Sequence, residues 1–237
     1  MKVFITAPFS NFPTIMNILK KSNKNIIPII GSCSLYPTKT TYNDLYNAIK
    51  QSNYSKIFPK SHENNLIKGI SNYKDVKKYG DTILSVNMSD PNDIEYLNII
   101  IPNNINIEIN IDSNVRVDID NYISNGIGDL ISSERDFNIC KVPYNTSLNI
   151  LEKLYKVGFR QFHLNKQDND PDLTKYHLTK IEEVDRYFFG DMEIIAGEIF
   201  EIDTIPRYRW CGAEHMSIST ICMNPFKMNK LLNNSII

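Results

Sequence analysis

Two short polar segments near the end of the chain have the residue types of a phosphate site. An apolar run ends at Gly197, in "EIIAGEIF", and the next apolar run ends at Ser219 and Thr220, in "HMSISTICM". Backbone N–H groups in the turns after two neighbouring strands can bind phosphate, and glycine lets a ligand approach the chain closely. If both runs are neighbouring parallel strands, we expect Gly197, Ser219 and Thr220 to face each other across one anion site.

The elements that must position these segments alternate between strand and helix patterns. Short runs rich in Ile and Val, bounded by turn residues, predict strands. They cover residues 25–33, 56–58, 82–88, 105–111, 137–142, 160–165, 192–197 and 215–220. Apolar residues at helical spacing predict helices over 42–52, 146–158 and 175–188, and a further helix near Pro225.

This alternation argues for parallel strands joined by right-handed crossovers. Eight such units in one domain close into a (β/α)8 barrel of the α/β class, and 237 residues suffice for it. We expect a single TIM-barrel domain over residues 1–237; an open doubly wound sheet is the alternative, because the second unit is poorly defined. Functional residues in such a barrel lie where strands end.

The composition limits the partners and the compartment. Lysine and arginine number 26 and aspartate and glutamate 27, spread along the chain, so we expect no nucleic-acid or anionic-membrane partner. No apolar run approaches the length of a membrane span, and no N-terminal signal segment is visible. We therefore expect a soluble, cytoplasmic protein.

Cysteine and histidine spacing predicts no metal site. Cys33, Cys140, Cys211 and Cys222 are far apart and form no CxxC pair, so we expect reduced packing residues. Among the four histidines no two share one element at metal-ligand spacing. His163 lies near a predicted barrel mouth, but because it alternates with two apolar residues it could equally face the helical layer.

Several stretches of the chain read like one known family. The strongest are "GFRQFHLN", "HLTKIEEVDRYFFGDMEIIAGEIF" and "CGAEHMSISTICMNP", and weaker ones are "APFSNF", "IGSCSLYP" and "IEINIDSN". Together they resemble dihydroorotate dehydrogenases, which are FMN-binding barrels. The resemblance implies a dihydroorotate-dehydrogenase-like barrel, and in an active member a flavoprotein oxidoreductase of pyrimidine biosynthesis.

The resemblance also assigns cofactor residues. Lys141, in "CKVP", matches the family's flavin-contacting lysine, and Gly197, Ser219 and Thr220 match its FMN-phosphate cradle. Read without the family, Lys141 is a barrel-mouth lysine held by a carboxylate.

Substrate residues follow from the same likeness. Asn110 and Asn114 match asparagines that bind the orotate ring, and Ser113 falls on the base that takes the C5 proton. Without the family, "IDSN" is a polar turn after a strand.

The chain departs from the family at three loops. "FPKSHEN" and "LNKQDNDPDLTKY" lack the family's glycines, and "AGEI" replaces "AGGGI" with one residue fewer and an added acid, Glu198. A carboxylate beside a phosphate dianion costs on the order of 1 kcal/mol or more. Glu198 could equally be a solvated residue at a helix N-terminus.

These departures lead to two functional expectations. The first is a barrel that has lost catalysis and serves as a binding or scaffold protein, with a protein partner or as a homo-oligomer. The alternative is a divergent FMN-dependent oxidoreductase acting on dihydroorotate or a related pyrimidine. The sequence leaves open whether the protein is an enzyme.

Overall fold

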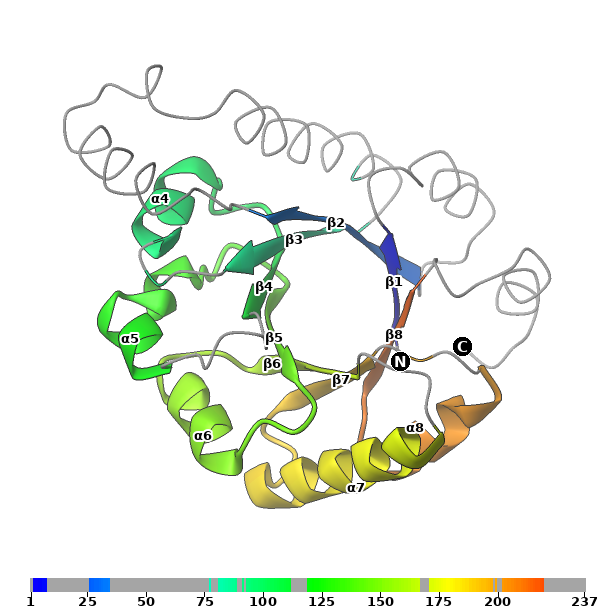
Figure 1. The fold of residues 1–237 in the computed structure, drawn as a ribbon. Coiled ribbons are helices and arrows are strands. Elements are labelled where there is room, and N and C mark those ends of the chain that lie inside the picture. Colours follow the sequence, from blue (N-terminus) through cyan, green and yellow to red (C-terminus); the bar gives the residue numbers. More distant parts are fainter. Residues whose placement is uncertain are drawn as a thin grey trace.

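A closed ring of parallel strands organises the molecule (Figure 1). The computed structural model describes residues 2–7, 26–34, 77, 81–88, 91, 93–111, 119–166, 171–197, 199 and 202–219. The strands are β1 (Val3–Ala7), β2 (Ile26–Ser34), β3 (Ile83–Met88), β4 (Ile107–Ile111), β5 (Asn138–Pro143), β6 (Gln161–Asn165), β7 (Glu193–Gly197) and β8 (His215–Ser219). Each strand pairs in parallel with the next, and β8 pairs with β1. The predicted α/β TIM-barrel architecture is confirmed, whereas the open sheet is wrong.

The first strand is not the one that the sequence predicts. Residues 3–7 form β1, which pairs with β2 on one side and β8 on the other, so residues 26–34 form the second strand. The ring is complete with β2 paired directly to β3, and the strand predicted at 56–58 lies outside the described residues. A five-residue apolar run is too short for its pattern to distinguish it from other apolar runs.

Helices surround the strands on the outside of the barrel (Figure 1). Those in the described ranges are α4 (Asp93–Ile100), α5 (Ile119–Ser124), α6 (Leu148–Lys156), α7 (Pro171–Phe188) and α8 (Ile205–Trp210), with 3-10 turns η3 (Ile127–Leu130) and η4 (Ile202–Thr204). The predicted cap of α6 is present, because the Ser147 side chain accepts a hydrogen bond from Ile150 N. The helices predicted over 42–52 and near Pro225 lie outside the described residues, and a single domain over the whole chain stays a prediction.

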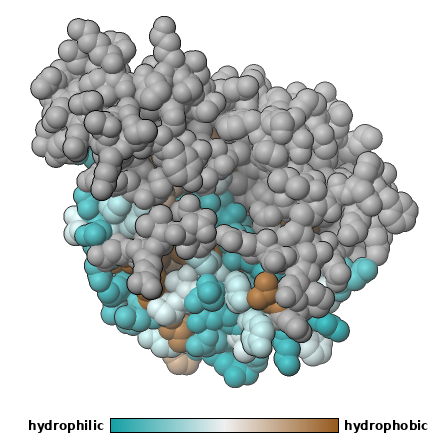
Figure 2. All heavy atoms as spheres, in the orientation of Figure 1, coloured by the Kyte–Doolittle hydropathy of each residue, from teal (hydrophilic) through white to brown (hydrophobic). Residues whose placement is uncertain are grey.

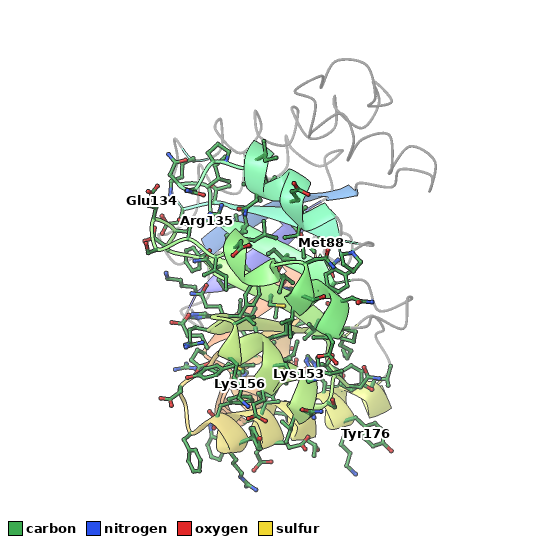
Figure 3. All side chains as sticks on the ribbon, turned by 90° about the vertical axis from the view of Figure 1, so that its left-hand side faces the viewer. Met88, Glu134, Arg135, Lys153, Lys156 and Tyr176 are labelled. Carbon is green, nitrogen blue, oxygen red and sulfur yellow. The ribbon has the colours of Figure 1, made fainter. Side chains whose placement is uncertain are left out.

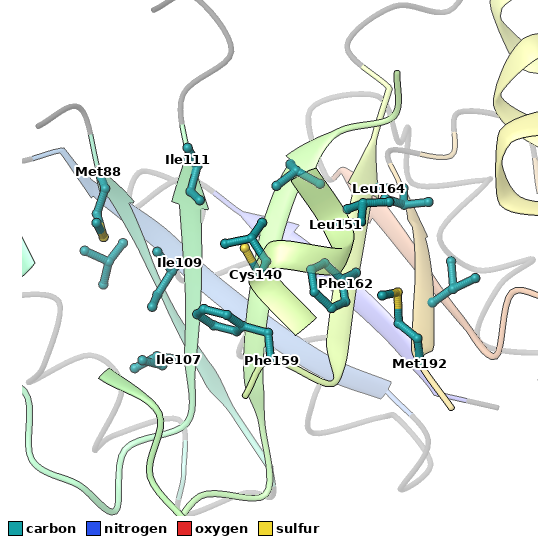
Figure 4. Close-up of a cluster of buried hydrophobic side chains, with 14 of the residues drawn as sticks. Met88, Ile107, Ile109, Ile111, Cys140, Leu151, Phe159, Phe162, Leu164 and Met192 are labelled. Atoms are coloured by element: carbon teal, nitrogen blue, oxygen red, sulfur yellow. The ribbon is translucent and has the colours of Figure 1, made fainter. Parts of the chain in front are cut away.

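Alternating strand residues divide the core into two clusters. One lies between strands and helices, where Ile109, Cys140 and Phe162 point toward the layer that contains Leu151 of α6 (Figure 4). The second cluster is inside the barrel, near the N-terminal ends of the strands; its members are Phe4, Ile83, Phe137, Ile139 and Ile195. Apolar side chains therefore close the bottom of the barrel, and a ligand site inside the barrel must lie above them.

The described surface seen from one end of the barrel is mainly hydrophilic, with apolar side chains scattered among polar ones (Figure 2). In the parts of the chain that the structure describes, no helix combines the length and the apolar character needed to cross a bilayer.

Candidate functional site

Above the apolar bottom, the interior of the barrel is polar. Ser85, Glu108, Lys141, His163 and Ser217 are all buried, and none is more than 9% exposed. Their neighbours in each strand belong to the cluster that faces the helices, so these five side chains point into the barrel. TIM-barrel interiors are normally filled with bulky branched residues, and burying a charged group costs several kcal/mol unless it is paired. The polar interior therefore needs a specific explanation.

A carboxylate and an imidazole form the centre of this group. Glu108 Oε2, from β4, lies 2.6 Å from His163 Nδ1, from β6, and Ser85 Oγ of β3 donates to Glu108 Oε1 at 2.8 Å. Three strands thus converge on one fully buried carboxylate.

Electrostatics keep Glu108 ionised. Burial raises the pKa of its carboxyl, but the charges of His163 and Lys141 and the hydrogen bonds from His163 and Ser85 outweigh burial and lower this pKa to about 2. Because an ionised carboxylate only accepts, His163 must carry its hydrogen on Nδ1, and Nε2 is the ring nitrogen that can exchange a proton with a ligand.

Lys141 adds a positive charge beside this pair. In the register of the strands its Cα is opposite Asn110 on β4 and His163 on β6. Its charge helps to lower the pKa of Glu108. The reading of Lys141 as a lysine held by a carboxylate stays a prediction, as does its predicted contact with a flavin. Asn110 is partly buried, nearer the end of β4 than Glu108 is.

Gly197, at the end of β7, lies against the second nitrogen of His163. A Cβ at this position would be 2.0 Å from His163 Nε2 and 2.9 Å from Ser217 Cβ. Any side chain at 197 would displace the imidazole, so His163 alone is sufficient reason for a glycine here. The role of Gly197 in an anion cradle stays a prediction, and the space beside its Cα is filled by His163 rather than open to a flavin phosphate.

Two buried oxygens flank the same place. Ser217 Oγ, on β8, and Asn165 Oδ1, at the end of β6, are buried and accept or donate no hydrogen bond in the described part of the chain. The Cα of Asn165 is opposite that of Gly197 in the β6–β7 register. Nearly all buried polar atoms in proteins have a hydrogen-bond partner. These two oxygens therefore make the wall formed by β6, β7 and β8 a candidate place for a ligand.

The structure describes the other predicted site residues only in part. Ser219 ends β8 beside β7, which confirms that the two segments of the predicted cradle belong to neighbouring strands. The structure describes only the backbone of Ser219. Ser113, Asn114, Glu198 and Thr220 lie outside the described residues, so their predicted roles stay predictions.

Sequence reasoning missed Glu108, although a signal was present. In "IEINI" an acid stands in an apolar strand between isoleucines, and acidic residues are almost never fully buried unless they are paired. Such an acid predicts a buried partner, but the pattern does not say which. The sequence pattern also left open which way the His163 side chain points. In the structure it points into the barrel interior.

A separate network anchors β6 to two helices. His177 of α7 has Nε2 2.9 Å from Leu164 O and Nδ1 3.1 Å from the hydroxyl of Tyr208 in α8. The carbonyl can only accept, so Nε2 carries the hydrogen and Nδ1 accepts from Tyr208. Burial lowers the pKa of His177 to about 3. This histidine is therefore neutral and holds helices, and it is not part of the barrel interior.

Within the described ranges no group of three or more His, Cys, Asp or Glu side chains could hold a metal ion.

Comparison with known proteins gives the fold and no family. No family model matches the sequence, and no curated protein matches it. Dihydrodipicolinate synthase from Bacillus clausii is similar in structure, with a TM-score of 0.57 and 13% identity over 98% of this chain and 72% of that chain. A mutant tryptophan synthase alpha-subunit from Pyrococcus furiosus has a TM-score of 0.54 and 11% identity over 98% and 94%. Thiamine phosphate pyrophosphorylase from Pyrococcus furiosus has a TM-score of 0.53 and 10% identity over 98% and 97%.

The resemblance to dihydroorotate dehydrogenases is wrong. The similar structures belong to other barrel families, and no family model supports the likeness in sequence. They give no support to FMN, to an oxidoreductase or to pyrimidine biosynthesis. The physical reason lies in the motif that carried the likeness, because the packing of His163 already demands the glycine that ends β7. At these identities the comparisons show a shared fold alone.

Proposed function

We propose that the protein is an enzyme that binds a small carboxylic acid in the barrel and exchanges a proton with it through His163. The observation that carries the proposal is the buried Glu108–His163 pair, with a 2.6 Å contact, beside Lys141 in the barrel interior.

The cost of this arrangement supports a functional role. Replacing a buried ion pair by apolar residues of similar volume is often neutral or stabilising. A barrel retained only for its outer surface would thus gain nothing from keeping Glu108, Lys141 and His163 inside. Buried ionisable groups with shifted pKa values and specific partners cluster at functional sites.

Each residue then has a chemical role. Glu108 holds the hydrogen on His163 Nδ1 and fixes the plane of the ring, so that Nε2 gives or takes the proton. Lys141 attracts the carboxylate of the ligand through its positive charge. The interior contains one acidic and two basic side chains. Because the basic side chains are in excess, the interior can accept an anion.

Hydrogen exchange into small molecules tests the proposal. The protein is incubated in D2O with pyruvate, oxaloacetate, malate or lactate, and loss of carbon-bound hydrogen is followed by proton NMR. We expect exchange above the buffer rate in at least one compound, and about a hundredfold slower exchange with His163→Gln. His177→Gln is the matched control, since that histidine lies outside the interior. Equal rates in wild type and His163→Gln, or no exchange at all, would overturn the proposal.

The expected binding role is a second candidate, because one surface feature favours it. A groove of about 920 Å³ between α6 and α7 is lined by Tyr155, Phe188 and Phe189, among others. Phe189 is 91% exposed. Figure 3 shows α6, with Lys153 and Lys156 labelled, beside α7. Acidic and basic side chains from both helices line the groove, which makes its charge self-complementary and fits a second copy of this chain.

The variant Phe189→Gly distinguishes loss of the dimer from loss of folding. Phe189 has a φ of 53°, a left-handed conformation that glycine adopts without strain, so the variant should be more stable as a monomer. Light scattering after gel filtration should show a dimer for wild type that weakens in Phe189→Gly. A wild-type monomer at high concentration would remove the candidate.

A further inference from the structure

We infer that the ligand of the barrel interior is a hydroxy acid, whose carboxylate binds Lys141 and whose hydroxyl binds Asn165 and Ser217. The inference rests on the proposed function and names the substrate class of the same site.

The first step is the state of two oxygens. Ser217 is fully buried, and its Oγ has no hydrogen-bond partner within the described residues; the same holds for the buried Oδ1 of Asn165. Leaving a buried polar atom without a partner destabilises the folded protein. Two such atoms on one wall of one barrel are a cost that a ligand hydroxyl would remove.

The second step is their position relative to His163. The point where a Gly197 Cβ would lie is 2.0 Å from His163 Nε2 and 2.9 Å from Ser217 Cβ, so the serine and the reactive nitrogen meet at Gly197. Asn165 is opposite Gly197 in the strand register and two residues beyond His163 on β6. Lys141 lies on β5, the neighbouring strand. The polar wall and the cation are therefore within reach of one small molecule.

The third step is the chemistry of the partners. An amide oxygen only accepts, so the ligand must offer a donor to Asn165, whereas the Ser217 hydroxyl can donate in return. A hydroxyl group both donates and accepts, and thus satisfies both atoms. An ammonium group would also donate, but it would stand beside the positive charge of Lys141 and offers no lone pair to Ser217. The remaining anionic group of the ligand suits Lys141.

Matched pairs of acids test the class. Isothermal titration calorimetry compares glycolate with acetate, lactate with propionate, and malate with succinate, and adds alanine as the amino counterpart of lactate. For at least one pair, we expect the hydroxy acid to bind wild type about tenfold more tightly than its deoxy analogue. Ser217→Ala and Asn165→Leu should each remove most of this preference and leave the affinity for the deoxy acid unchanged. Lys141→Met should weaken both members.

The outcomes separate the two proposals. Equal affinity within every pair, with loss of both in Lys141→Met, would reject the hydroxy acid and leave the anion site intact. Tighter binding of alanine than of lactate would also reject it. If no acid binds wild type, the inference fails, and the deuterium exchange experiment decides the proposed function independently. Ser217→Ala removes a single unpaired atom, so it keeps the test valid even if Asn165→Leu does not fold.

Discussion

Glu108 is the residue on which the interior depends. Its carboxylate accepts hydrogen bonds from Ser85 and His163, and the charge of Lys141 lowers its pKa. Side chains from three other strands therefore interact with it. Neutralising this one group leaves His163 and Lys141 in a buried site without their counter-charge. Replacement of Glu108 should therefore affect stability and its pH dependence together.

Glu108→Gln is expected to lower the free energy of unfolding by about 1–3 kcal/mol at pH 7, because the charged partner of His163 is lost. In wild type, the pKa of Glu108 is about 2 in the folded protein against an ordinary 4.5, so between these values the unfolded chain binds more protons. Wild-type stability should fall as the pH drops from 4.5 toward 2. Urea unfolding at a series of pH values should show this component in wild type and not in the glutamine variant; parallel curves would contradict the assignment.

Gly197→Ala should destabilise the protein by about 1–3 kcal/mol, since the added methyl would overlap His163 Nε2. The loss should shrink strongly in a His163→Ala background, where the space beside residue 197 is vacated. Chemical denaturation of the four proteins of this double-mutant cycle measures the coupling. Additive losses would show that Gly197 is needed for another reason.

At the scale of elements, β6 shows how one strand serves two purposes. Its alternation sends His163 into the barrel, and Phe162 and Leu164 toward the helices. On that outer side the Leu164 carbonyl accepts from His177 of α7, which in turn accepts from Tyr208 of α8. The strand that carries the reactive imidazole is therefore fixed from outside by a neutral histidine.

Removing the titration of His177 should flatten one part of the stability profile. The pKa of His177 is about 3 in the folded protein, against an ordinary 6.5, so the unfolded chain takes up its proton first. Stability should thus fall as pH drops below 6.5, at up to about 1.4 kcal/mol per pH unit. In His177→Gln, whose amide can still donate to Leu164 O, unfolding between pH 6.5 and 4.5 should lack this slope. An unchanged slope would mean that other groups cause it.

Local pattern was enough to predict most of these elements. The runs over 105–111, 160–165 and 192–197 each contain a barrel strand, and Ser147 caps α6 as its position predicts. Helix α7 begins at Pro171, four residues before its predicted start, because proline is favoured in the first turn and carries no apolar periodicity. Strand β1 is defined by its two neighbours rather than by its own sequence.

The candidate site could be predicted only in part. The expectation that polar residues gather at strand ends placed Asn110, Lys141 and His163 correctly in the barrel strands. The contact between Glu108 and His163 joins residues 55 positions apart, and nothing in either strand specifies the other. The family resemblance instead predicted that Gly197 binds phosphate. In the structure, the small size of Gly197 allows an imidazole to pack against it.

For the whole molecule, the site depends on closure of the ring, because β1 lies between β8 and β2 and pairs with both. Phe4 of β1 is fully buried, and its ring packs edge-on against Phe137 at 5.8 Å in the apolar cluster below the polar interior. The N-terminal strand therefore both completes the hydrogen bonding and seals the bottom of the barrel.

Phe4→Ala should cost about 3–5 kcal/mol and loosen the closure specifically. We expect backbone amides of β1 and β8 to exchange with deuterium faster than those of β5 and β6, because the cavity lies where the ring closes. Phe159→Ala is the matched control: it removes an equally buried ring that packs against Phe162 outside the barrel. It should lower stability to a similar extent without this bias toward β1 and β8. If both variants loosen all strands equally, the barrel opens as one unit and β1 has no special part in holding it closed.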